Sequence, residues 1–340
     1  MSKITDLANT LRSLLANGVY SPGARFPSEY ELMERYEVSR ITANKAVALL
    51  TAEGFLERGK RGSGTFVRRC RKFPQGWIAA FMDVSNVYNA NIIAGAANMA
   101  MLNNYMLSVF NPRLPEITDT LKKLEQSDCI GVLTGGYGIL PETFPKPVIY
   151  MDVGIDELEH GPHHNVTCDN YGAAHEMMSR VLASGMREVV TVTMPNHFHR
   201  LMRQRGFKDA MQEHNINDIE ARCFAFRASD WHYEMRQIMR RIMREYPAVE
   251  CIVTDSDDIV LQILKICKSE NIDCPGRIKL TGFGNIHGVS DIYRLPTVDQ
   301  HPWHMGHEAV GALLKLVNDP ESCGTVKIEV PAEVLNSEFI

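Results

Sequence analysis

The first 67 residues alternate between short helical patterns and tight breaks. Apolar residues recur on one face over residues 4–17, which predicts an amphipathic opening helix. Ser28 and Ser39 each precede a further stretch of helical spacing, and a serine hydroxyl caps a helix by accepting hydrogen bonds from its free backbone amides. Gly54 marks the end of the last stretch, because glycine tolerates the left-handed backbone that follows many helices. The pattern predicts three helices, with a short break between the second and the third.

Two short apolar stretches follow the third helix. Residues 55–58 and 64–67 have the pattern of strands, and the glycine-rich segment between them carries Lys60 and Arg61. A helix, a tight turn, a second helix and a basic hairpin together indicate a winged helix-turn-helix. This fold places one helix end in the major groove of DNA.

The rest of the chain has a different pattern. From residue 77 short apolar runs alternate with helical spacing, which predicts an α/β fold with parallel strands buried on both faces. The strand-like runs cover residues 78–82, 105–110, 129–133, 147–151, 189–193, 251–253 and 279–283. Helical spacing recurs at residues 90–103, 117–126, 171–184, 201–215, 231–246 and 258–271. One compact sheet of the usual domain size does not hold so many units, so two similar lobes are predicted.

These patterns divide the chain into three parts. We predict a winged helix-turn-helix domain over residues 1–69, a linker over residues 70–76 and a two-lobed α/β domain over residues 77–340. Residues 1–72 hold 13 Lys and Arg against 7 Asp and Glu, a net charge of +6. The whole chain carries −5, so the remainder carries −11. Because an acidic surface repels DNA, DNA binding is expected in the first domain alone.

Composition narrows the class of protein further. Apolar residues make up 45% of the chain, but no run of about eighteen is present to span a bilayer. Polar residues interrupt the opening helix, which argues against a signal peptide and favours the cytoplasm. The eight cysteines form no CxxC pair, so reduced and mostly buried thiols are expected.

Candidate DNA-binding residues gather at the start of the third helix. Short polar and basic side chains there meet phosphates beside the positive end of the helix dipole. They are Ser39, Arg40, Thr42, Asn44 and Lys45. Arg40 suits a bidentate contact with a guanine edge, and Asn44 suits either an adenine edge or a phosphate. Lys60 and Arg61 at the hairpin tip suit the DNA backbone or the minor groove.

A longer series of motifs spans residues 4–67. The motifs are Pro22-Gly23, Phe26-Pro27-Ser28-Glu29, Val38-Ser39-Arg40-Ile41-Thr42, Glu53-Gly54 and Gly62-Ser63-Gly64-Thr65-Phe66-Val67. Their order resembles the DNA-binding domain of the GntR family. The resemblance implies DNA contacts by Ser39, Arg40, Thr42 and Gly64. Tyr30 and Asn44 stand where many members carry arginine, so the operator sequence is not implied.

The α/β part carries looser motifs. They are Asp83-Val84-Ser85-Asn86-Val87-Tyr88-Asn89, Asp169-Asn170-Tyr171-Gly172-Ala173, Arg203-Gln204-Arg205-Gly206-Phe207, Ser256-Asp257, Gly282-Phe283-Gly284-Asn285 and Thr297-Val298-Asp299-Gln300. Their order resembles the ligand-binding domain that LacI/GalR regulators share with periplasmic sugar-binding proteins. Gly284 departs from the family pattern, which has an acidic residue there.

Candidate ligand-binding residues come from these motifs. In open α/β sheets ligands bind beyond the carboxyl ends of the strands, where loops and helix starts converge. The candidates at such positions are Asp83, Tyr88, Arg203, Asp257 and Asn285. Asp169 either caps a helix or reaches the ligand. Charged planar groups suit pairs of sugar hydroxyls, and aromatic side chains such as Phe81, Tyr88 and Trp303 suit the apolar face of a sugar ring.

The two resemblances together imply a transcriptional repressor of sugar-utilisation genes that a small sugar such as L-arabinose releases from its operator. One winged helix covers only a half-site, so a homodimer on double-stranded DNA is expected. No cofactor motif is present: the glycines at residues 135–138 lack the lysine of a phosphate-binding loop. His301, His304 and His307 are spaced by three, which does not favour a metal site.

Other functions stay open at this point. An enzyme-like α/β domain could be fused to the DNA-binding domain, although no motif holds a nucleophile and a base. A corepressor-type regulator could bind a different small metabolite. A GntR regulator with an all-helical, acid-sensing body is a further alternative, which the strand-like runs contradict.

Overall fold

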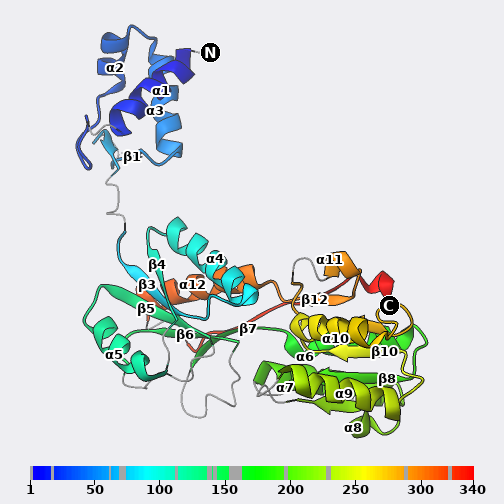
Figure 1. The fold of residues 1–340 in the computed structure, drawn as a ribbon. Helices are drawn as coiled ribbons and strands as arrows, with labels where there is room; N and C mark the ends of the chain where they lie inside the picture. Colours follow the sequence, from blue (N-terminus) through cyan, green and yellow to red (C-terminus); the bar gives the residue numbers. More distant parts are fainter. Residues whose placement is uncertain are drawn as a thin grey trace. The chain divides into compact units, whose positions relative to one another are not determined.

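The computed structural model describes residues 3–16, 19–60, 63–68, 74–111, 114–135, 140, 144–152, 163–194, 198–226, 231–286, 290–320 and 324–340. The chain divides into two compact units, Met1–Gln75 and Gly76–Ile340, which we call the head and the body (Figure 1). In the described part of the chain no helix combines the length and the apolar surface needed to cross a membrane.

The head is a small helical domain with a two-stranded hairpin. Its elements are α1 (Lys3–Ala16), α2 (Glu29–Tyr36), α3 (Arg40–Ala52), β1 (Leu56–Arg58) and β2 (Thr65–Val67). The serine caps are confirmed: Ser28 accepts a hydrogen bond from Glu31 N within a capping box, and Ser39 accepts one from Thr42 N. Gly54, with φ 83°, follows α3 in the left-handed conformation, as predicted.

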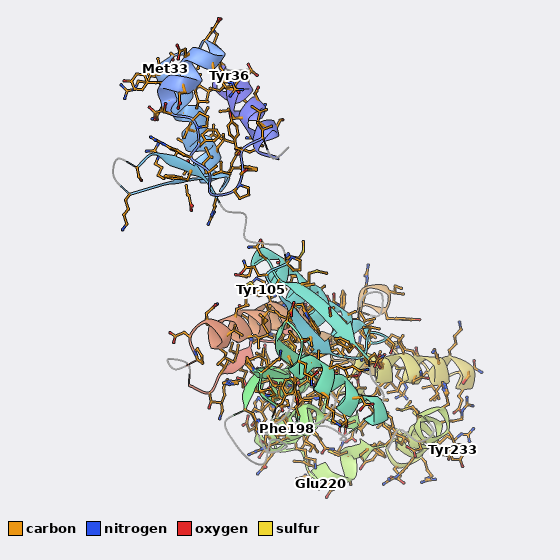
Figure 2. The ribbon with its side chains drawn as sticks, turned by 90° about the vertical axis from the view of Figure 1, so that its left-hand side faces the viewer. Met33, Tyr36, Tyr105, Phe198, Glu220 and Tyr233 are labelled. Atoms are coloured by element: carbon orange, nitrogen blue, oxygen red, sulfur yellow. The ribbon has the colours of Figure 1, made fainter. Side chains whose placement is uncertain are left out.

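A single core holds the head together. Leu11, Phe26, Leu32 and Leu50 are almost fully buried and join α1, α2, α3 and the segment before α2. Met33 and Tyr36 of α2, labelled in Figure 2, pack against this core from its edge. The hairpin strands pair antiparallel, with Leu56 opposite Val67. The core therefore fixes α3 and the hairpin as one rigid surface.

The body contains two parallel sheets, which define its two lobes (Figure 1). The first sheet has the order β13-β7-β6-β5-β3-β4, and all its pairs are parallel. Its strands are β3 (Trp77–Phe81), β4 (Met106–Phe110), β5 (Cys129–Thr134), β6 (Val148–Met151), β7 (His164–Cys168) and β13 (Lys327–Val330). The second sheet has the order β11-β10-β8-β9. Its strands are β8 (Val189–Thr193), β9 (Cys223–Ala225), β10 (Cys251–Thr254) and β11 (Lys279–Thr281).

Helices cover both faces of each sheet, which explains why the strands are apolar runs rather than alternating patterns. The helices are α4 (Val87–Leu102), α5 (Leu114–Glu125), α6 (Asn170–Ala183), α7 (Phe198–Glu213), α8 (Ile219–Arg222), α9 (Trp231–Glu245), α10 (Asp257–Glu270), α11 (Ser290–Tyr293), α12 (Pro302–Asn318) and the 3-10 turn η1 (Ser337–Phe339). In the first lobe α4 and α12 cover one face and α5 the other. In the second lobe α9 and α10 cover one face, and α6 and α7 the other.

The chain passes repeatedly between the lobes. It leaves the first lobe after β7, returns through β12 (Thr297–Asp299) into α12, and leaves again after β13 toward β14 (Glu333–Leu335). β12 and β14 pair antiparallel, and Val298 and Val334 pack in the core beside α6. These crossing segments bring the carboxyl ends of both sheets to one region of the body, which is where ligands bind in α/β folds.

Candidate functional site

The candidate DNA-binding side chains lie at the amino end of α3. Ser39 and Thr42 are engaged with each other, since their hydroxyls are 2.9 Å apart and Ser39 Oγ also caps Thr42 N at 3.2 Å. Lys45 is exposed one turn further along. The free amides of this helix end and the nearby cations form a surface suited to phosphate.

Arg40 is held by two residues of α2. Its Nε lies 3.7 Å from Glu29 Oε2, and its guanidinium carbon lies 5.1 Å from the centre of the Tyr30 ring. Asn44 Nδ2 donates a hydrogen bond to the other carboxylate oxygen of Glu29. The Arg40 side chain is still 62% exposed. Two candidate base-reading groups are thus oriented by one carboxylate before DNA arrives.

The hairpin places a further cation beside α3. Lys60 is exposed, and Gly64 follows it in a left-handed conformation with φ 98°. A Cβ at Gly64 would meet Arg25 Nε at 3.1 Å, so a larger residue there would push this arginine aside. Arg61 lies outside the described residues. The head therefore gathers Ser39, Arg40, Thr42, Asn44 and Lys45 on one helix, with Lys60 and Gly64 on the adjoining hairpin.

The body holds a cavity of about 290 Å³ between its lobes. Its polar lining consists of Asn86, Tyr88, Asn89, Asp152, His199, Arg200, Arg203, Ser256, Asp258 and Gln300. Its apolar lining consists of Met82, Ile92, Met151, Met194, Phe283 and Ile286. Residues before position 153 belong to the first lobe, and residues 194–286 belong to the second. A ligand in this cavity touches both lobes at once.

Arg203 is fixed on the wall that the second lobe contributes. Its Nε donates to Asn170 Oδ1 at 2.8 Å, and its Nη1 donates to the backbone oxygen of Asp255 at 2.8 Å. The guanidinium carbon lies 3.8 Å from the centre of the Phe283 ring, and the residue is only 4% exposed. Among the described residues no hydrogen bond uses Nη2. The guanidinium is therefore held in place, and Nη2 is left to donate into the cavity.

Arg200 lies one helical turn before Arg203. Its Nη1 is 3.3 Å from Asp255 Oδ1, and Asp255 also accepts a hydrogen bond from Met194 N at 3.1 Å. Burial lowers the pKa of the Arg200 guanidinium and raises the pKa of Asp255, while the pair's mutual attraction opposes both shifts. Within the described part of the chain Arg200 Nε is buried without a hydrogen-bond partner. Burial of a donor of this kind without a partner costs free energy.

Asp152 supplies the opposing acceptor from the first lobe. Its Oδ1 accepts from Thr167 Oγ1 at 3.0 Å and from Asn170 Nδ2 at 3.1 Å, and its Oδ2 accepts from Tyr88 Oη at 3.2 Å. Burial opposes ionisation of Asp152, but the charges of His199 and Arg203 and these hydrogen bonds outweigh it and lower its pKa. Burial and the Asp152 charge raise the pKa of Tyr88. A carboxylate thus faces two guanidinium groups across the cavity.

Two of the six predicted ligand residues line this cavity, namely Tyr88 and Arg203. Asp83 instead closes a turn on the surface, because its Oδ1 accepts from Ser85 N at 2.9 Å and from Ser85 Oγ at 2.7 Å. Asp169 caps α6, because its Oδ1 accepts a hydrogen bond from Gly172 N at 2.6 Å. Of its two predicted roles, this oxygen has that of the helix cap. Phe81 of β3 is fully buried on the face of the first sheet that α5 covers, so its ring does not reach a ligand.

Asp257 and Asn285 also have structural roles. Asp257 is 1% exposed, and it accepts hydrogen bonds from Thr297 Oγ1 at 2.9 Å and Ile286 N at 2.8 Å. It therefore fastens the loop after β11 to the start of α10, and its neighbour Asp258 lines the cavity in its place. Asn285 lies outside this cavity and donates to Asp299 Oδ2 at 3.0 Å.

Sequence reasoning missed Asp152, Arg200 and Gln300. Asp152 directly follows the predicted strand at residues 147–151, so its position at a strand end was a usable signal. Arg200 precedes Arg203 by three residues on α7, which places both on one helix face. Gln300 follows β12, a strand that the apolar pattern did not reveal.

The arrangement suits recognition of a polyhydroxylated molecule rather than a reaction. Guanidinium, carboxylate and amide groups line the cavity together with thioether and aromatic side chains. Within the described residues no group of three His, Cys, Asp or Glu side chains could hold a metal ion. Fixed donors and acceptors of this kind bind pairs of hydroxyl groups.

Two family models match the chain. The model for bacterial regulatory proteins of the gntR family matches residues 3–67. The model for the periplasmic binding protein-like domain matches residues 179–336. The two matches show a GntR-type DNA-binding domain followed by a periplasmic binding protein-like domain. The chain is similar over 93% of its length to two proteins named arabinose metabolism transcriptional repressor.

The similarity to these relatives extends over nearly the whole of each chain. The protein from Geobacillus stearothermophilus is 20% identical and is covered over 92% of its length. The protein from Halalkalibacterium halodurans is 23% identical and is covered over 89%. A solved LacI family regulator from Enterococcus faecium, with bound ribose, has a TM-score of 0.65 at 16% identity and covers 76% of this chain and 96% of its own. These relatives are all named as transcriptional repressors or regulators.

Proposed function

We propose that this regulator represses sugar-utilisation genes and that a small sugar such as L-arabinose releases it from its operator. The cavity between the lobes carries the proposal, because its opposing walls supply Arg203 and Asp152 from different lobes. A sugar held by both walls has more contacts when the lobes are closed, so it shifts the body toward closure. The names of the full-length relatives support the choice of arabinose.

The head supplies the second half of the proposal. Its basic helix end and hairpin bind a half-site on double-stranded DNA, and two copies of the chain bind a near-palindromic operator as a homodimer. Such a protein acts in the cytoplasm, where the DNA is. Closure of the body alters the spacing of the two heads, so sugar and operator oppose each other.

An operator titration with and without saturating L-arabinose tests the proposal. We expect the sugar to weaken operator binding, typically by about 5–150-fold. An operator affinity that the sugar leaves unchanged would contradict release by an inducer. An operator affinity that the sugar increases would identify the sugar as a corepressor. Arg203→Ala removes the fixed fork at a loss of about 1.5–3 kcal/mol in sugar binding, and it leaves DNA binding by the head intact. Gln237→Ala, on the exposed face of α9, is the control for substitution in the same lobe.

A sugar that carries a carboxylate or phosphate is the second candidate effector. The two guanidinium groups that line the cavity, Arg200 and Arg203, favour it, because an anionic oxygen satisfies a guanidinium better than a hydroxyl does. Calorimetry against pentoses, hexoses, sugar acids and sugar phosphates separates the two candidates. Binding of the acids alone would exclude arabinose.

A further inference from the structure

A second cavity, of about 250 Å³, adjoins the first. It shares Tyr88, Gly284 and Ile286 with the first cavity, so these three residues form the boundary between them. We call the first the inner compartment and the second the outer compartment. The outer compartment is further lined by α4 and by the segment that joins β12 to α12.

An aromatic side chain forms one wall of the outer compartment. Trp303 lines it and is 38% exposed. The His307 ring stacks on the indole at 5.2 Å with an angle of 22°, and the His304 ring meets it edge-on at 5.3 Å. The Trp303 backbone lies against Gly95 of α4, where a Cβ would overlap its carbonyl oxygen. The indole is therefore held in place, and a fixed aromatic surface favours the apolar face of a sugar ring.

Polar groups line the outer compartment beside the Trp303 indole, and polar groups line the inner compartment too. Asp299 Oδ2 accepts from Asn285 Nδ2 at 3.0 Å, and Asp299 Oδ1 accepts from His301 N at 2.8 Å. Asp299 is 23% exposed at its side chain, and Asn91 stands opposite on α4. These are acceptors and donors for hydroxyl groups beside an apolar wall, which is the composition of a sugar site.

Gly284 leaves the boundary between the compartments without a side chain. Its φ is 126°, and a Cβ there would have Gln300 Oε1 at 3.9 Å and Asp257 Oδ2 at 4.0 Å as its nearest neighbours. The glycine leaves room for a ligand to extend from one compartment into the other.

We propose that the two compartments form one site and that its preferred effector has two sugar rings. One ring occupies the inner compartment beside Arg203 and Asp152, and the second lies against Trp303 in the outer compartment. The inference rests on the proposed function, since it assumes that the inner compartment binds sugar.

Calorimetry on the full chain tests this with L-arabinose, D-xylose, arabinobiose and xylobiose as probes. We expect a disaccharide to bind about tenfold more tightly than its monosaccharide, as one added aromatic contact supplies. Trp303→Ala should remove this advantage and keep the affinity for the monosaccharide. Asn91→Phe, which fills the outer compartment from α4, should do the same. Tyr171→Ala is the control, because Tyr171 is also 38% exposed and lines neither compartment.

The outcomes separate the two proposals. Equal binding of mono- and disaccharides by the wild type overturns the two-ring site and leaves the proposed function standing. Binding of none of the four sugars overturns the choice of a pentose and the two-ring site together. A disaccharide advantage that survives both Trp303→Ala and Asn91→Phe places the second ring elsewhere and overturns the assignment of the outer compartment.

Discussion

One carboxylate organises the DNA-reading end of α3. Glu29 contacts Arg40 at one oxygen and Asn44 at the other, and Tyr30 lies beneath the Arg40 guanidinium. Tyr30 and Asn44 are the two positions where the chain departs from the arginines of many GntR members. A neutral amide and an aromatic ring thus replace two cations around the same glutamate. Operator preference is expected to follow this local set rather than the family pattern.

The first prediction concerns Arg40. Arg40→Ala should cost about 1–3 kcal/mol on the operator and much less on random DNA, because a bidentate base contact is lost only on the cognate site. Fluorescence anisotropy with both DNAs measures the difference. Lys45→Ala, on the same exposed helix face, is the control and should weaken both DNAs alike as a phosphate contact. Equal losses for Arg40→Ala on both DNAs would reduce Arg40 to a phosphate contact.

The second prediction concerns the buried Asp257. Burial raises its pKa to about 6, against about 3.9 in an unfolded chain. A carboxyl with a raised pKa binds its proton more tightly when folded. Its contribution to stability is therefore complete below about pH 4 and is lost as the pH rises through 6.

Asp257→Asn keeps the shape and removes this titration. The unfolding free energy of the variant, relative to wild type, should rise by about 2 kcal/mol between pH 4 and pH 7. Urea unfolding at both pH values measures it. Asp128→Asn, at an exposed position just before β5, should show no such change. A constant difference across the pH range would mean that Asp257 is already ionised at pH 4.

The helices α4 and α12 approach each other closely at two glycines. A Cβ at Gly306 would overlap the carbonyl oxygen of Ile92, and a Cβ at Gly95 would overlap that of Trp303. Small residues such as Ala96 and Ala309 continue this contact and are almost fully buried. The two helices therefore behave as one unit. Through α12, this unit connects the segment after β12 to the face of the first sheet on which both helices pack.

The third prediction uses two glycines of the same helix. Gly306→Ala should lower the unfolding free energy by about 1–3 kcal/mol, because α4 must move to admit the methyl group. Gly311→Ala should leave it unchanged or raise it by about 0.5–1 kcal/mol, since its nearest neighbour is Met99 Cε at 3.5 Å and alanine favours helix. Chemical denaturation of both variants measures the contrast. Equal effects would show that the two helices separate easily.

The same elements show how far the pattern of apolar residues reaches. The strands at Val189–Thr193 and Cys251–Thr254 were predictable because parallel strands buried on both faces are continuous apolar runs. β7 was missed because His164, Asn165 and Thr167 interrupt its apolar residues. α12 is absent from the predicted helices, although Pro302 at its first position is typical of a helix start.

In the ligand site, only residues that stand in a recognisable sequence motif were predictable. Arg203 and Tyr88 stand in recognisable motifs and line the inner compartment. Asp257 stands in a motif too, but its carboxylate is turned to Thr297 and to the backbone of Ile286. Arg200 and Asp152 meet only because separate lobes fold around one cavity. Such a meeting depends on tertiary geometry and leaves no spacing in the sequence.

The head and the body differ in net charge, and the first lobe of the body carries an exposed apolar surface. The head carries +6 and the rest of the chain −11, so the head alone is attracted to DNA. The first lobe carries exposed apolar side chains where α4 ends and β4 begins. They are Met101, Leu102, Met106 and Val109, at 62%, 68%, 46% and 37% exposure. Since β4 is the edge strand of its sheet, a second copy of the chain can cover this surface by a symmetric contact.

The last prediction tests this surface as the dimer interface. Leu102→Glu combined with Met106→Glu places charges at the centre of a symmetric contact, where each meets its own copy, so the dimer should dissociate. Ile292→Glu is the control, because Ile292 is 73% exposed on α11 of the other lobe. Sedimentation equilibrium should give half the mass for the double variant only. Operator binding should then weaken by about 100-fold or more. In the dimer, binding of one head holds the second head near its half-site, and a monomer has no such second head. A double variant that keeps both its mass and its operator affinity would place the dimer contact on another surface.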